Sequence, residues 1–224
     1  AIENRSVGGS TPSPGTTFLS PYLCRAICDP CHAVVGVYDP LTREENVMKL
    51  NDVLLPTYLQ MLNALSAWLG KASEQLTENL AATIMHARLA DDMFPLFTQV
   101  CFSCVQAHEG RARLRQEALA GSVTQLLADG RDALAAPRSI AEAQARIAET
   151  IRTVEAAAAD PAELAPDTPV EHRLPNGMIF DLTAAQYVRD WAIPQFYFHV
   201  MAAYAILRAQ GVSLGKADYV THMF

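Results

Sequence analysis

A repeat of apolar side chains every three or four residues, which begins near residue 51, restricts the fold of this chain more than any other feature. Its first run consists of Tyr58, Met61, Leu62, Leu65 and Leu69. This spacing places all five side chains on one face of a helix. Because an apolar face must be buried against other elements, the run predicts a long helix that packs against further helices.

The same period recurs in four later segments, which we predict to be helical. They cover about 74–88, a stretch after Asp91 or Asp92, a stretch from Ser139 to Asp160, and a last one from Thr183 to Gly211. Start and stop signals support these bounds: Asp91 or Asp92 as an N-cap, the capping-box pairs Ser139/Glu142 and Thr183/Gln186, and Gly211 as the residue after the C-cap. Pro194 is expected to kink the last helix, because proline lacks a backbone N–H.

The period changes to two between Val170 and Leu182. Apolar residues alternate on both sides of Pro175-Asn176-Gly177, and Asn-Gly between two alternating runs is a strong signal for a β-hairpin. Four long helices with one small hairpin predict an all-α fold, namely a four-helix bundle with a β-hairpin before the last helix.

Charge and cysteine usage restrict the partners and the compartment. The net charge is −7, so we expect no nucleic-acid partner and no polybasic contact with a membrane. The longest uncharged stretch, 191–207, contains Pro194 and is shorter than the roughly 20 residues that a membrane-spanning helix needs. An odd number of cysteines and the lack of a signal peptide predict a reducing, cytoplasmic setting.

Residues 1–47 differ in composition and hydrophobic periodicity from the rest of the chain. They are rich in Gly, Pro, Ser and Thr and show no lasting period. We interpret 1–47 as a leader or extension, loop-like or disordered, and 48–224 as the helical domain.

Within this segment, Cys24, Cys28 and Cys31 match the spacing of a radical-SAM iron–sulfur motif. The chain lacks the alternating strands and helices of the corresponding barrel, so we interpret that spacing as chance.

Three stretches together resemble a family. ARLADDMFPL (87–96), PNGMIFDLTAAQYV (175–188) and PQFYFHVMAAYAILRAQGVSLGKADY (194–219) are similar to an uncharacterised domain-of-unknown-function family, which is grouped with the DinB/YfiT-like metalloenzymes. The resemblance covers about 48–219. It implies a four-helix bundle of up-down-down-up topology, which is often a homodimer.

The resemblance also implies where a site would lie. Better-understood members of the superfamily bind a divalent metal, such as Zn, Ni or Mn, through one histidine on the second bundle helix and an H-x-x-x-H pair on the last. His199 matches the second histidine of the pair, whereas Gln195 and Gln99 occupy the other two positions. Two of the three expected histidines are therefore missing. His199 is either a ligand-binding or metal-binding residue, or a core histidine bonded to a neighbour such as Gln99 or Tyr204.

A second cluster offers softer ligands. Cys101, Cys104 and His108 share one helix face at i, i+3 and i+7, which presents two thiols and an imidazole to a soft metal. Buried cysteines usually behave as small hydrophobic residues, and we favour that interpretation.

Two further groups have both structural and functional interpretations. Arg88, Asp91 and Asp92 most simply cap and bridge the start of a helix, although an acid–base pair or an anion clamp is the alternative. The last helix concentrates aromatic residues, which belong to the core or an interface or else line a pocket next to His199. They are Tyr187, Trp191, Phe196, Tyr197, Phe198 and Tyr204.

Two functional hypotheses follow. The first is a bundle that binds a small molecule in its interior with His199, Gln195, Gln99 and Tyr204, as a degenerate metal-dependent transferase or hydrolase if it is catalytic. The second is a non-catalytic, dimeric structural or stress-related bundle whose metal site has decayed.

Overall fold

The computed structural model describes residues 48–160, 162–174 and 176–223. The leader predicted at 1–47 and the motif of Cys24, Cys28 and Cys31 lie outside these residues. The described part consists of helices and one two-stranded antiparallel hairpin.

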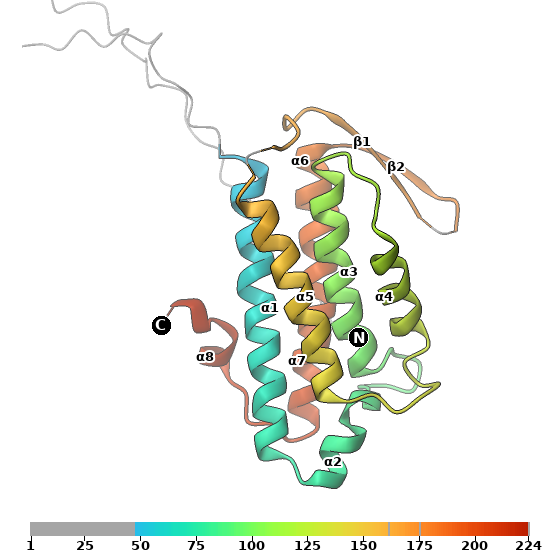
Figure 1. The fold of residues 1–224 in the computed structure, drawn as a ribbon, viewed down its shortest axis with the longest axis vertical. Coiled ribbons are helices and arrows are strands. Elements are labelled where there is room, and N and C mark those ends of the chain that lie inside the picture. The colour runs from blue at the N-terminus through green and yellow to red at the C-terminus, as the bar shows by residue number, and fades with distance from the viewer. Residues whose placement is uncertain (1–47, 161, 175, 224) are drawn as a thin grey trace, which may run out of the picture. The chain divides into compact units, whose positions relative to one another are not determined.

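Four long helices form the bundle shown in Figure 1: α1 (Leu50–Gln75), α3 (Leu96–Arg113), α5 (Ile140–Ala158) and α7 (Ile193–Ala209). α1 and α7 run in one direction and α3 and α5 in the other, which confirms the predicted up-down-down-up topology. Around the bundle, α1 lies beside α5, α5 beside α3, α3 beside α7, and α7 beside α1.

The predicted stripe of α1 forms the centre of the core. Tyr58, Met61, Leu62, Leu65 and Leu69 are each at most 1% exposed. Each large apolar side chain buried in this way contributes about 1.5–3 kcal/mol to folding. The inward face of the last helix is also buried, and its residues include Phe196, His199, Val200, Ala203, Ile206 and Leu207.

A short helix that the sequence did not signal, α4 (Gly121–Arg131), packs on α3 within the connection from α3 to α5. Gly130 permits this contact, because a Cβ atom there would lie 2.9 Å from the ring of Phe102 and 3.0 Å from Cβ of Cys101. The Thr98 hydroxyl donates a 2.6 Å hydrogen bond to the Gly130 carbonyl oxygen. α4 lacks a side-chain N-cap and buries only a narrow stripe, which explains why its pattern is weak.

Two predicted details of the helix boundaries are wrong. The segment predicted at 74–88 is divided, because α1 continues to Gln75 and is followed by the short helices α2 (Glu78–Thr83) and η1 (Ile84–His86). Neither Asp91 nor Asp92 caps α3, whose N-cap is Pro95. The N–H of Leu96 instead donates to the carbonyl oxygen of Ala87, so backbone from the preceding turn replaces the expected carboxylate.

The other predicted boundary signals are confirmed. Ser139 caps α5 by accepting from the N–H of Glu142, and Thr183 and Gln186 form a complete capping box. That box opens α6 (Ala184–Gln186), which continues through the π-helical segment η2 (Tyr187–Ala192) into α7.

The end of α7 is also as predicted. Gly211 has φ +88° and ends the helix in a Schellman motif, in which its N–H donates to the Arg208 carbonyl oxygen and the next N–H donates to that of Leu207. Pro194 occupies the first turn of α7, directly after η2.

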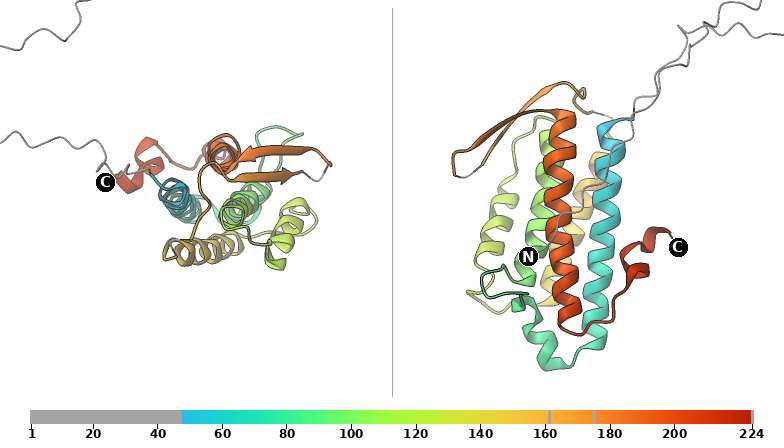
Figure 2. Two further views of the ribbon diagram at one scale, coloured as in Figure 1. Left: turned by 90° about the horizontal axis from the view of Figure 1, so that it is seen from above. Right: turned by 180° about the vertical axis from the view of Figure 1, so that it is seen from behind.

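The predicted hairpin comprises β1 (Pro169–Arg173) and β2 (Ile179–Thr183), in which Val170 pairs with Leu182 and His172 with Phe180. Val170 and His172 point inward and are buried. Gly177 has φ +87°, which a turn tolerates best with glycine. The hairpin lies at the end of the bundle where α6 begins, and the views of Figure 2 also show α8 (Lys216–Tyr219) beside α1.

Among the helices of the described residues, none has the length and apolar character that crossing a membrane requires.

We predict that Gly110→Ala destabilises the bundle. A Cβ atom at position 110 would lie 2.1 Å from the hydroxyl oxygen of the fully buried Tyr58, so one of the two helices must shift. We expect the free energy of unfolding to fall by about 1–3 kcal/mol, as in other overpacked cores, in urea denaturation.

Gly121→Ala is the matched control, because no described atom lies within 4 Å of the position that its Cβ atom would take. Tyr58→Phe should restore part of the stability lost in Gly110→Ala, since it removes the oxygen that clashes. Equal stability of the Gly110→Ala and Gly121→Ala variants would show that this close contact does not exist.

Candidate functional site

The structure brings His199 of α7 and Gln99 of α3 together. Nδ1 of His199 lies 2.9 Å from Oε1 of Gln99, and both residues are buried. Nε2 of Gln99 in turn donates a 3.2 Å hydrogen bond to the carbonyl oxygen of Phe94, in the turn before α3. Two positions that the family resemblance singled out, 100 residues apart in sequence, therefore meet between adjacent helices.

This chain of hydrogen bonds determines the state of the imidazole. Because the amide nitrogen of Gln99 donates to Phe94, its oxygen faces His199 and accepts a hydrogen bond from Nδ1–H. The second ring nitrogen, Nε2, then carries a lone pair. Burial lowers the pKa of His199 to about 4, so the ring is neutral near pH 7.

Aromatic rings surround His199. Phe102 and Phe198 meet the imidazole edge to face, with ring centroids 5.3 Å and 5.2 Å away. Phe94 packs in the same manner on Phe102. Phe94 is 51% exposed and Phe198 is 62% exposed, so the histidine lies just below an aromatic surface patch. We call Phe94, Phe102, Phe198 and His199 the aromatic ledge.

The other two predicted site residues do not join this pair. Gln195 lies one helical turn before His199 on α7 and is half-buried, and no hydrogen bond joins it to the histidine among the described residues. Tyr204 lies in a different cluster, where its ring packs against Trp68 at 5.2 Å and against Tyr219 at 6.3 Å. Tyr204 therefore supports the docking of α8 on the bundle.

The donor set around His199 does not fit a divalent metal. Among the described residues, no group of three or more His, Cys, Asp or Glu side chains is placed to hold an ion. Nδ1 of His199 is occupied by Gln99, which leaves one imidazole nitrogen and amide oxygens. Zinc and nickel prefer several nitrogen or sulfur ligands. Gln99 acts here as an outer partner of the histidine.

Cys101, Cys104 and His108 lie on one face of α3, as predicted, but they form no soft-metal site with the described residues. Both thiols are fully buried. Burial raises the pKa of Cys104 to about 12 and raises the pKa of Cys101 as well, so both remain protonated thiols. His108 lies 3.2 Å from the hydroxyl of Thr150 on α5. The arrangement agrees with core packing.

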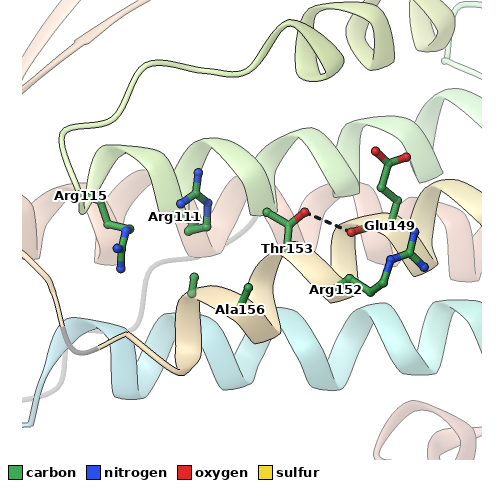
Figure 3. Close-up of a pocket in the computed structure, with 7 residues that line it drawn as sticks. Arg111, Arg115, Glu149, Arg152, Thr153 and Ala156 are labelled. Carbon is green, nitrogen blue, oxygen red and sulfur yellow. Dashed lines mark hydrogen bonds between the residues drawn. The ribbon is translucent and has the colours of Figure 1, made fainter.

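An open surface groove of about 600 Å³ lies between α3 and α5, and Figure 3 shows its lining. Three arginines reach it, namely Arg111, Arg115 and Arg152. Arg111 is paired with Glu117 at 2.6 Å, and Arg115 with Glu117 at 2.8 Å and Asp160 at 2.5 Å. Because most of this positive charge is already paired, the groove offers little attraction to an anion.

Sequence reasoning missed a group of polar atoms under the hairpin, at the other end of α3. They lie in the side chains of Tyr58, His172, Tyr187 and Trp191, and none has a hydrogen-bond partner within the described part of the chain. Each such atom lowers the stability of the fold by about 1–3 kcal/mol when it makes no hydrogen bond. One signal was visible, since His172 alternates with apolar residues on the inward face of β1. Tyr187 and Trp191 lie against this histidine, and Tyr187 is fully buried, in line with the interpretation of these aromatic residues as core.

The up-down-down-up arrangement of the four long helices defines a helical bundle of the DinB type. A solved structure, that of a DinB family member protein from Shewanella denitrificans, is similar at 30% identity and a TM-score of 0.56, over 76% of this chain and 91% of that chain. The family model of DUF1993, a domain of unknown function, matches residues 50–220. The chain belongs to this family. A search of curated proteins found no significant match.

We predict that protonation of His199 destabilises the fold as the pH falls. Its pKa is about 4 in the folded chain and near 6.5 in the unfolded chain, so the unfolded state takes up the proton first. The stabilisation is complete above about pH 6.5 and is lost between pH 6.5 and pH 4. The free energy of unfolding should fall by about 2 kcal/mol between pH 7 and pH 5 from this residue.

Urea denaturation at the two pH values measures the fall. His199→Gln should reduce it, whereas His222→Gln, at an exposed position, should leave it unchanged. Burial also lowers the pKa values of His108 and His172, so part of the fall remains in the variant. An identical pH dependence in His199→Gln and the native chain would contradict the burial of a neutral His199.

Proposed function

We propose that this DUF1993 protein binds a small molecule at the aromatic ledge, with Nε2 of His199 as the hydrogen-bond acceptor. The observation that carries the proposal is the chain of hydrogen bonds from the Phe94 carbonyl oxygen through Gln99 to Nδ1 of His199. It holds the ring in one tautomer and one orientation, so the lone pair on Nε2 is ready before any ligand arrives.

The surroundings of the imidazole indicate the class of ligand. Phe102 and Phe198 offer apolar faces and edges, and a neutral Nε2 accepts a hydrogen bond. A small aromatic or apolar molecule that carries one O–H or N–H donor matches both features. Because the pKa of His199 is lowered to about 4, the ring is a weak base near pH 7. The site therefore favours binding over general-base catalysis.

Metal dependence and a cytoplasmic setting stay predictions of the sequence. The resemblance to metalloenzymes implies a divalent ion, and a metal-binding histidine does typically donate its other N–H to an outer partner, as His199 donates to Gln99. The lack of further ligands beside His199 in the described residues argues for metal-free binding.

A second candidate is the dimeric, non-catalytic bundle. Phe94, Phe198 and Met201 are 51%, 62% and 40% exposed, respectively. Exposed apolar side chains that gather in one place mark interaction surfaces as well as ligand sites. A second copy of the chain could cover the aromatic ledge in place of a small molecule.

Phenol is a suitable probe for the ligand-binding proposal, because it combines an aromatic ring with one O–H donor. We expect saturable shifts of the imidazole signal of His199 in NMR titrations, with a dissociation constant on the order of millimolar for so small a ligand. His199→Gln should abolish saturable binding. Because this variant lacks the imidazole signal, its titration is followed on the ring signals of Phe102 and Phe198. His86→Gln, which alters a histidine bonded to the Ala136 carbonyl oxygen, should retain it.

Unchanged phenol binding in His199→Gln would remove the basis of the proposal. Sedimentation velocity distinguishes the alternative, because a dimer that Phe198→Ser converts to monomer assigns the ledge to a second copy. Stoichiometric zinc, nickel or manganese in protein purified without a His-tag, lost in His199→Gln, would replace metal-free binding with a metal site.

A further inference from the structure

Five buried polar atoms without partners gather beneath the hairpin, away from the aromatic ledge. They are Oη of Tyr58, Oη of Tyr187, both ring nitrogens of His172 and Nε1 of Trp191, and within residues 48–223, apart from 161 and 175, nothing bonds to them. Tyr58 and Tyr187 are fully buried and His172 is 2% exposed. Buried polar atoms in folded proteins are nearly always bonded, to protein, water or a ligand.

These atoms come from different elements but lie close together. The ring of His172 on β1 is 4.5 Å from that of Trp191 and 5.5 Å from that of Tyr187, both on η2. Nδ1 of His172 is 3.7 Å from Oε1 of Glu109 on α3. The hydroxyl of Tyr58 on α1 reaches the same turn of α3, since it would lie 2.1 Å from a Cβ atom at Gly110.

The backbone makes room for this cluster in two ways. Gly110 is the residue that lets the Tyr58 hydroxyl approach α3. The π-helical turn η2 places Tyr187 and Trp191 toward the hairpin, and π-helical turns inside α-helices are frequent at functional sites. Gly110 thus accommodates the hydroxyl of a residue of the α1 stripe, and η2 departs from regular α-helical geometry.

The charges of the cluster exclude charged organic molecules and metal ions as its ligands. Glu109 and Arg113 form an ion pair at 3.7 Å, so the site has little net charge to attract an ion. A metal ion would find only Glu109 and His172 as ligands among the described residues, beside the positive Arg113. The tyrosine hydroxyls stay protonated, because burial raises the pKa of both far above its usual value.

We propose that Tyr58, His172, Tyr187 and Trp191 form a binding site for a small neutral molecule that carries both hydrogen-bond donors and acceptors, such as a primary carboxamide. The indole N–H of Trp191 can only donate, so the ligand must supply an acceptor such as a carbonyl oxygen. One nitrogen of a neutral His172 and the carboxylate of Glu109 accept, so the ligand must also supply an N–H or O–H. A carboxamide offers both groups on one carbon atom.

The ligand enters beside the hairpin. A cleft of about 370 Å³ lies between the end of α3 and β1, and Arg113, Val170 and Glu171 are among the residues that line it. Val170 precedes the buried His172 by one inward position on β1. None of the four cluster residues lines this cleft, so the hairpin must move away from η2 to admit the ligand and then restore the contacts that bury Val170 and His172.

The two tryptophans of the chain provide a reporter and its control. Trp191 is in the cluster and its indole N–H has no partner among the described residues, whereas Nε1 of Trp68 donates a 3.0 Å hydrogen bond to the Asp218 carbonyl oxygen. In titrations of the full chain with acetamide, the indole N–H signal of Trp191 should shift downfield and saturate while that of Trp68 stays. Acetate and methylammonium should leave both signals in place.

Stability gives an independent test of the cluster. Tyr187→Phe removes a hydroxyl that nothing in the described chain bonds, so Tm should stay the same or rise by about 2–4 °C, while acetamide binding weakens at least tenfold. Thr98→Val removes a buried hydroxyl that does have a partner, so its Tm should fall. If Tyr187 had only a structural role, Tyr187→Phe would lower Tm as Thr98→Val does.

Any one of three results would overturn the proposal. The first is a Trp191 signal that acetamide leaves unmoved, and the second is an equal shift with acetate or methylammonium. The third is a Tm that falls in Tyr187→Phe as it does in Thr98→Val, which would show a hydroxyl bonded to structural water. Because the phenol titration reports on His199 and the acetamide titration on Trp191, either site can fail without the other.

Discussion

α3 packs against α4, α5, α7 and η2 at once, so its polar side chains have little access to water. A buried polar group destabilises a fold unless it is bonded. In the first half of α3 this requirement is met within the protein. Thr98 donates to Gly130, Ser103 donates to the Gln99 carbonyl oxygen, and the Gln99 side chain joins Phe94 to His199. The position of α4 and the orientation of His199 both depend on these bonds.

The second half of α3 differs. Glu109 and Gly110 lie among Tyr58, His172 and Tyr187, whose polar atoms find no partner in the described chain. The first half of α3 thus holds His199 of α7 through Gln99, whereas the second half faces a cluster whose polar atoms have no hydrogen-bond partners in the described chain. Groups that lower stability without helping the core are typical of functional sites, where local consistency gives way to binding.

Local patterns predicted much of the fold because their causes are local. The stripe from Tyr58 to Leu69, the caps at Ser139 and Thr183, and the turn at Gly177 each depend on residues within a few positions. α4 and the start of α3 were not predictable in this way. α4 is held by Gly130 against α3, and the first N–H of α3 bonds to Ala87, so both depend on contacts between segments.

Consecutive residues were enough to establish an all-α bundle with a hairpin and to mark His199 as a candidate, because periodicity, caps and a family motif are local features. The partners of the candidates came from the packing of the helices instead. Packing joined His199 to Gln99, left Tyr204 with Trp68, and gathered Tyr58, His172 and Tyr187 from three distant segments. Burial and hydrogen-bond satisfaction arise only when helices meet, and no single segment encodes them.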